Sequence, residues 1–145
     1  MAIQEIDVSA HSKGSPEQVW ALLADARSWP RWAPFDDATV EEGEGIGELR
    51  RFKRGRRTTR ERVTTFDPPR VFGYELVSGV PIRDYHAEVT LTPGNEGTDI
   101  RWRSRFRAKI PGTGAIARRQ LERFIEQTVR SLADEAEVSP SAGTP

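Results

Sequence analysis

Ile100-Arg101-Trp102-Arg103-Ser104-Arg105-Phe106-Arg107 is the stretch that decides the fold class, because uncharged residues alternate with arginines without a break. Successive side chains of a β-strand point to opposite faces of a sheet, so this alternation predicts a strand with one buried and one solvated face. The buried face would carry Ile100, Trp102, Ser104 and Phe106. We interpret the four arginines as one solvated strand face.

A long helix is predicted after this strand. The turn signal Pro111-Gly112-Thr113-Gly114 is followed by apolar residues at helical spacing over residues 113–137. The helix would be ~37 Å long at a rise of about 1.5 Å per residue. Its apolar face would consist of Ala117, Leu121, Phe124, Ile125, Thr128 and Leu132.

About six strands are predicted between residues 37 and 107. Turn signals divide this region at residues 43–47, at Gly55, at Asp67-Pro68-Pro69, at Gly79 and Pro81, and at residues 93–97. Successive hairpins make the sheet antiparallel. Its single apolar face needs a cover, and the helix over residues 113–137 is the one element long enough to provide it.

The N-terminal region adds one strand and two short helices. Residues 5–10 alternate as a half-buried strand does. Ser15-Pro16-Glu17-Gln18 is typical of a helix start, with Ser15 as cap and Gln18 closing a capping box, and this helix would end near Asp25. Ser28-Trp29-Pro30-Arg31-Trp32 predicts a second short helix capped by Ser28.

Composition limits the class of protein. The 145 residues suit one domain, predicted over residues 1–137, with a disordered tail over residues 138–145. The 22 basic and 22 acidic residues give zero net charge, so we expect no nucleic-acid partner. The chain has no cysteine, which excludes disulfides and fits a cytoplasmic location. It also has no apolar run of membrane-spanning length, so no stable membrane insertion is expected.

Metal and cofactor sites are not predicted. His11 and His86 are the only histidines, and neither has a spacing to carboxylates that would build a metal site. Ser104 is predicted to face inward, but no base is placed beside it, so nucleophilic catalysis has no support. We therefore nominate no catalytic residue and no cofactor.

Several motifs together resemble one superfamily. They are Ser15-Pro16-Glu17-Gln18-Val19-Trp20-Ala21-Leu22-Leu23-Ala24-Asp25, Trp29-Pro30-Arg31-Trp32, Phe66-Asp67-Pro68-Pro69-Arg70, and Gly97-Thr98 leading into Ile100-Arg101-Trp102. With the order of elements, they resemble the START-related helix-grip superfamily, and most of all its bacterial polyketide cyclase/dehydrase-like branch of ligand-binding SRPBCC proteins. That superfamily includes lipid and sterol carriers, hormone receptors and aromatic polyketide cyclases.

The resemblance implies an α+β helix-grip fold. A curved antiparallel sheet of about seven strands, in the order β-α-α-β6-α, would wrap around the long C-terminal helix with a cavity between them. The residues expected to bind a ligand there are Trp32, Phe35, Phe52, Tyr74, Arg83, Tyr85, Trp102, Phe106, Leu121 and Phe124. Plain core packing is the competing interpretation for the aromatic residues among them.

Some of these residues carry more specific expectations. Tyr74 and Tyr85 are the better pocket residues, because a buried phenol needs a hydrogen-bond partner that a ligand could supply. Trp32 and Phe35 follow Trp29 closely and would form a flap over the cavity mouth, unless they dock the short helix. Arg83 shares strand parity with Tyr85, so it either faces the cavity or lies exposed at its rim.

Three functions remain open from the sequence. The first is binding or transport of a hydrophobic molecule, such as a lipid, fatty acid, isoprenoid or polyketide-like aromatic, by a monomer or homodimer. The second is a polyketide cyclase-like enzyme in which Arg83, Tyr74 and Tyr85 polarise a carbonyl or move a proton. The third is an interaction protein that uses the basic hairpin over residues 50–62. Against the third, Glu41, Glu42, Glu44 and Glu48 could pair with that hairpin across strands.

Overall fold

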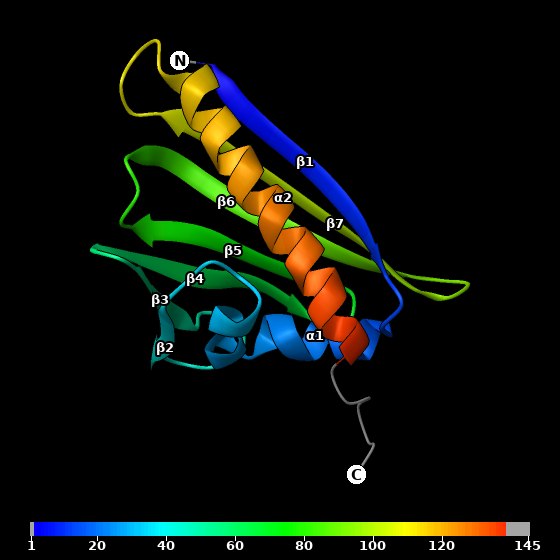
Figure 1. Ribbon diagram of the computed structural model, residues 1–145. Coiled ribbons are helices and arrows are strands. Elements are labelled where there is room, and N and C mark those ends of the chain that lie inside the picture. The colour runs from blue at the N-terminus through cyan, green and yellow to red at the C-terminus, as the bar shows by residue number, and fades with distance from the viewer. Residues whose placement is uncertain (1, 139–145) are drawn as a thin grey trace.

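The computed structural model describes residues 2–138 and contains a seven-stranded sheet with helices on one side (Figure 1). In chain order the elements are β1 (Ile3–Ser12), α1 (Pro16–Ala24), the 3-10 helix η1 (Ala26–Arg31), β2 (Asp37–Glu42), β3 (Leu49–Arg54), β4 (Arg57–Asp67), β5 (Val71–Ser78), β6 (Ile82–Gly94), β7 (Gly97–Ala108) and α2 (Gly114–Val138). The predicted α+β helix-grip architecture is confirmed.

The sheet is antiparallel throughout, in the order β1-β7-β6-β5-β4-β3-β2. Helix α2 runs diagonally across one face of it (Figure 1). In β7 the predicted alternation is confirmed: Trp102 and Phe106 are buried against the helix side. On the other face the arginines of β7 form ion pairs with Asp7, Glu88 and Glu5. This face is therefore a solvated, charge-paired surface.

The start of α1 is built as predicted. The hydroxyl of Ser15 accepts a hydrogen bond from the backbone N–H of Gln18, and the Gln18 side chain accepts one from the N–H of Ser15. The predicted cap of the second short helix is wrong. Asp25 caps η1, because its carboxylate accepts from the N–H of Arg27 at 3.1 Å. Ser28 lies inside η1, and its hydroxyl donates to the carbonyl of Leu22 at 2.8 Å.

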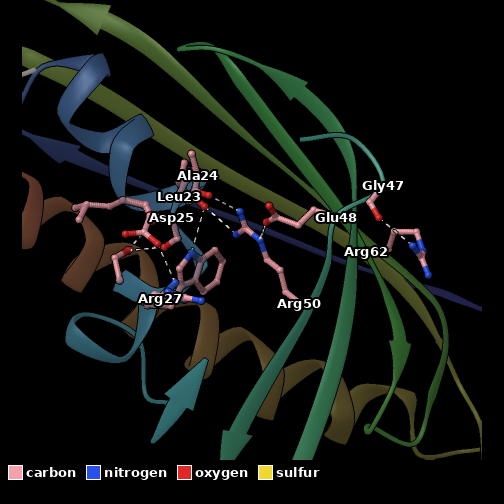
Figure 2. Close-up of polar contacts among 11 residues, drawn as sticks. Leu23, Ala24, Asp25, Arg27, Gly47, Glu48, Arg50 and Arg62 are labelled. Atoms are coloured by element: carbon pink, nitrogen blue, oxygen red, sulfur yellow. Dashed lines mark hydrogen bonds and ion pairs between the residues drawn. The ribbon is translucent and has the colours of Figure 1, made fainter. Parts of the chain in front are cut away.

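Arg50 is the exception in the basic hairpin, which was expected to present its charges to water. Its side chain is only 2% exposed. The guanidinium donates to the carbonyls of Leu23 at 2.8 Å and Ala24 at 2.7 Å, and it pairs with Glu48 (Figure 2). Because these carbonyls end α1, Arg50 caps the helix and ties it to β3.

Three further arginines of the hairpin are paired with glutamates of β2. Arg60 forms a two-pronged contact with Glu41, which also lies 3.9 Å from Arg51. Arg62 lies 3.9 Å from Glu42 and donates to the carbonyl of Gly47 at 2.9 Å (Figure 2). The predicted cross-strand pairing is therefore present for Glu41 and Glu42, whereas Glu48 pairs with Arg50 within one segment. Within the described residues Lys53, Arg54, Arg56 and Arg57 form no ion pair, so the hairpin keeps an excess of positive charge.

Helix α2 packs unevenly along its length. Its C-terminal half is buried through Ile125, Val129, Leu132, Ala133 and Ala136. In its N-terminal half Leu121 and Phe124 are only half-buried, and Ile116 is 62% exposed. The predicted helix over residues 113–137 matches α2, whose last residue is Val138. The rest of the expected tail, residues 139–145, lies outside the described residues.

Candidate functional site

Two tyrosines meet at the centre of the helix side of the sheet. Tyr74 in β5 and Tyr85 in β6 are 5% and 6% exposed, and their hydroxyl oxygens lie 2.9 Å apart. Burial raises the pKa of both phenols well above the usual value, so both stay protonated at neutral pH. One hydroxyl proton is used within the pair, which leaves the other available for a further acceptor.

Two more hydrogen-bond donors lie beside this pair in β7. The indole Nε1 of Trp102 and the hydroxyl of Ser104 are fully buried without a hydrogen-bond partner. As donors directed towards the hydroxyl of Tyr85, both partly offset the rise in its pKa, although neither reaches the geometry of a full hydrogen bond. A buried polar group that makes no hydrogen bond destabilises the folded protein by about 1–3 kcal/mol. An acceptor that reached these two donors would therefore be bound favourably.

Glu61 completes the polar group from the neighbouring strand β4. It shares a face with the buried Thr59 and Val63 and lies opposite Arg50 in β3. Glu61 is half-buried as a residue, and desolvation of its carboxyl raises the pKa to about 8, which the nearby Arg50 guanidinium only partly opposes. The carboxyl is therefore mainly protonated at neutral pH, and its charge when ionised would act on Tyr74 and Tyr85.

The five groups form what we call the donor cluster: Glu61, Tyr74, Tyr85, Trp102 and Ser104. At neutral pH each of them carries an N–H or O–H proton. The cluster sits among aromatic rings, with the ring of Tyr74 6.1 Å from that of Trp102 and the ring of Tyr85 6.4 Å from that of Phe106. Several hydrogen-bond donors in apolar surroundings are best suited to bind an acceptor oxygen that is carried by an apolar molecule.

A second group of predicted residues lies towards η1 and α2. The ring of Phe35 stacks on Phe52 at 4.7 Å and meets Phe124 edge-on at 5.6 Å. The flap predicted for Trp32 is wrong. Its ring is 5% exposed, packs 4.6 Å from Trp29 and donates its Nε1–H to Ser28. Phe35 is partly exposed, so it lines the boundary between core and surface.

The helix residues Leu121 and Phe124 lie where α2 is least buried. Both pack against the core cluster while keeping partial exposure. The guanidinium of Arg54, at the β3–β4 turn, lies 5.3 Å from the centre of the Phe124 ring. This half of α2 is therefore the less buried part of the helix.

Arg83 does not face the interior. The expectation rested on its sharing parity with Tyr85, but the register of β6 against β7 shifts between Arg83 and His86. Asp84 at this bulge has a positive φ of 54°, which breaks the alternation. The Arg83 side chain is exposed as a result. A carbonyl-polarising role for Arg83 inside the cavity is therefore withdrawn.

Two residues of the donor cluster were not predicted as site residues: Ser104, which was expected only to face inward, and Glu61. Glu61 falls inside the charged segment 50–62, which was interpreted as a solvated hairpin. The parity of the strand could have indicated Glu61, because it is two residues from both Thr59 and Val63 and so lies on the same face as these buried residues. Arg50 is related to Phe52 in the same way. An ionisable group in phase with buried apolar ones is a candidate for a site.

Comparison with known proteins agrees with this architecture. The family described as "Polyketide cyclase / dehydrase and lipid transport" matches residues 4–137. The chain belongs to this family. No curated protein matches the sequence.

Solved structures of the same fold extend over nearly the whole chain. The Zhui aromatase/cyclase from Streptomyces sp. R1128 has a TM-score of 0.81 at 20% identity and covers 99% of this chain and 100% of its own. An uncharacterised protein from Bacillus thuringiensis has a TM-score of 0.78 at 21% identity, covering 94% and 100%. Ara h 8.0201 has a TM-score of 0.74 at 13% identity, covering 95% and 100%. At these identities the likeness shows the fold.

Family membership leaves the ligand undefined, since the family's description spans both chemistry and transport. Within residues 2–138 no helix is long and apolar enough to cross a membrane. The chemistry must therefore be argued from the donor cluster of this chain.

Proposed function

We propose that this member of the polyketide cyclase/dehydrase and lipid transport family binds an apolar small molecule carrying a carbonyl or phenolic oxygen. The ligand would lie between the helix side of the sheet and the N-terminal half of α2. Its oxygen would accept hydrogen bonds from the donor cluster. Its apolar body would contact Phe106, Leu121 and Phe124.

One observation carries this proposal. Trp102 Nε1 and Ser104 Oγ are buried donors without a partner, on the same face as a pair of buried tyrosine hydroxyls. Burial without a hydrogen bond is unfavourable, so a ligand oxygen that supplies the missing partner gains affinity there. A purely apolar ligand would leave both groups unsatisfied.

A matched pair of ligands tests this. Methyl naphthyl ketone and isopropenylnaphthalene have nearly the same shape, but only the ketone has an acceptor oxygen. The ketone should bind more tightly by about 2- to 10-fold, the value of one net hydrogen bond of ~0.5–1.5 kcal/mol. Ser104→Ala and Trp102→Phe should reduce this preference, whereas Trp32→Phe, which removes an indole N–H that donates to Ser28, should retain it. Equal affinities in the unmodified protein would contradict the proposal.

Proton transfer at the same site is a second candidate function, favoured by Glu61. A carboxyl with a pKa of about 8 ionises near physiological pH and is then a stronger base than an ordinary glutamate. It could take a proton from the carbon beside a bound ketone, while the donors hold the resulting enolate oxygen. The aromatase/cyclase relative makes this class of reaction a reasonable one to test.

Deuterium exchange measures that step directly. A naphthyl β-diketone incubated with the protein in heavy water would gain deuterium at its central carbon faster than in buffer alone. The protein-dependent rate should rise with pH towards about 8, as the carboxyl of Glu61 ionises, and should be lost in Glu61→Gln. Exchange no faster than in buffer would leave ligand binding as the function.

A further inference from the structure

The sheet divides between β5 and β6. The ladder joining these strands runs from Val71–Thr90 to Glu75–His86 and stops there. Beyond that point β5 continues to Ser78 along β4, and β6 begins at Ile82 along β7. Figure 1 shows the two strands separating towards the loop that joins them.

Each of the two separating strands is held by the strand on its other side, β5 by β4 and β6 by β7. On one side, the β5–β6 loop is tied to β4, because Arg57 donates to the carbonyl of Gly79 at 3.0 Å. Gly79 lies so close to β4 that a Cβ there would sit 2.2 Å from the carbonyl oxygen of Thr58. On the other side, Ile82 pairs with Ala108 in β7. The separation is therefore fixed by the fold.

A recess of about 550 Å³ fills the division. Its walls come from both faces of the sheet. Arg62, Glu75 and His86 are cross-strand neighbours on the outer face. Leu76 and Tyr85, by contrast, belong to or pack against the core on the inner face. A recess lined from both faces leads from the outer surface to Tyr85, whose hydroxyl belongs to the donor cluster.

We propose that the division between β5 and β6 is a lateral portal through which the apolar, oxygen-bearing ligand reaches Tyr85 and the donor cluster. This inference rests on the proposed ligand-binding function and adds the route of access. Leu76, Val77 and Tyr85 give the portal apolar walls. Its mouth carries both signs of charge, from Arg62, Glu75 and Asp84, so it does not select strongly for charged ligands.

The ligand class follows from the two ends of the portal. A molecule that passes has to be apolar enough to slide along Leu76 and Val77. It also has to present an oxygen to the tyrosine pair at the inner end. A flat aromatic ketone or phenol satisfies both conditions, whereas a molecule that is charged along its whole length does not.

A removable bridge across the portal tests the proposal. The natural chain has no cysteine, so Val77→Cys with Asp84→Cys provides the only two thiols, one on each wall. They are joined by oxidation or, if the walls stay too far apart for a disulfide, by a short bis-maleimide. A matched control, Thr90→Cys with Arg101→Cys, bridges an intact part of the β6–β7 ladder. Intact mass establishes each bridge.

Stopped-flow quenching of tryptophan fluorescence by methyl naphthyl ketone gives the rates. The bridge at the portal should slow both association and dissociation by at least ~10-fold and leave Kd within about 2-fold, since a gate changes barriers and not the bound state. Reduction should restore the rates of the disulfide form, and the control bridge should not alter them.

The possible failures are distinguishable. Unchanged rates in the portal-bridged protein would overturn the portal while leaving the ligand-binding function intact. A loss of affinity without slower association would also overturn it, because the recess would then be part of the binding site itself. Absence of ketone binding in the unmodified protein would refute the proposed function and, with it, the portal.

Discussion

At the residue scale, the chain places ionisable and polar side chains in phase with its buried apolar ones at a few positions. Arg50 in β3 pairs with Glu61 in β4, but the two side chains have different roles. Arg50 satisfies its guanidinium with α1 carbonyls and Glu48, so it serves the fold. Glu61 is held in its neutral form by burial, so it remains available to a ligand.

The raised pKa of Glu61 predicts a specific pH dependence of stability. The unfolded carboxyl has its ordinary pKa of 4.5 and the folded one a pKa of about 8. Between these values the folded state binds more protons, so the free energy of unfolding should fall as the pH rises, by at most ~1.4 kcal/mol per pH unit from this group. Above pH 8 this contribution should level off.

Urea unfolding of the natural protein and Glu61→Gln between pH 5 and 9 isolates this effect, with the pH range taken from the two pKa values. As the pH rises, the free energy of unfolding of the natural protein should fall relative to that of Glu61→Gln. Two parallel curves would show that Glu61 ionises normally in the folded protein.

Arg50 predicts a loss of stability that its surface neighbours do not share. Arg50→Met should cost about 3–5 kcal/mol, because Glu48 and two helix-terminal carbonyls lose their partner in a buried setting. Arg103→Met, which breaks an exposed ion pair with Glu88, should cost less than ~1 kcal/mol. Similar losses from both, measured by urea unfolding, would contradict the assigned role of Arg50.

At the element scale, regular patterns could be predicted and interruptions could not. The alternation of β7 and the helical spacing of α2 follow directly from side-chain direction, and both are confirmed. Arg83 was left open between the cavity and its rim, and the structure decides for the exposed position because the bulge at Asp84 reverses the parity of the residues before it. The cap of η1 was misplaced because Asp25 and Ser28 are both good caps, and tertiary packing decides between them.

The two halves of α2 predict different roles for two leucines. Leu132 is fully buried, so Leu132→Ala should cost about 2–5 kcal/mol of stability. Leu121 is half-buried beside the proposed ligand site, so Leu121→Ala should cost clearly less while weakening binding of methyl naphthyl ketone. Urea unfolding and a binding titration on both variants separate the effects. If Leu121→Ala lowered stability more than Leu132→Ala, the N-terminal half of α2 would be the part packed in the core, which would contradict this assignment.

At the scale of the whole molecule, the fold could be predicted from sequence and the site only in part. Tyr74, Tyr85, Trp102 and Phe106 come together because their strands are neighbours in the sheet and their parities agree. The bond between the two tyrosine hydroxyls and the separation of β5 from β6 depend on how strands twist and pair at a distance. Neither has a local signal in the sequence.

The most direct test of the central claim observes the indole N–H resonance of Trp102 by nuclear magnetic resonance, with the signal assigned through Trp102→Phe. Saturating methyl naphthyl ketone should move this resonance downfield, because its free N–H gains an oxygen acceptor, while isopropenylnaphthalene should not produce that downfield shift. A Trp102 resonance that stays in place, or that responds alike to both ligands, would contradict an oxygen-recognising site in the interior.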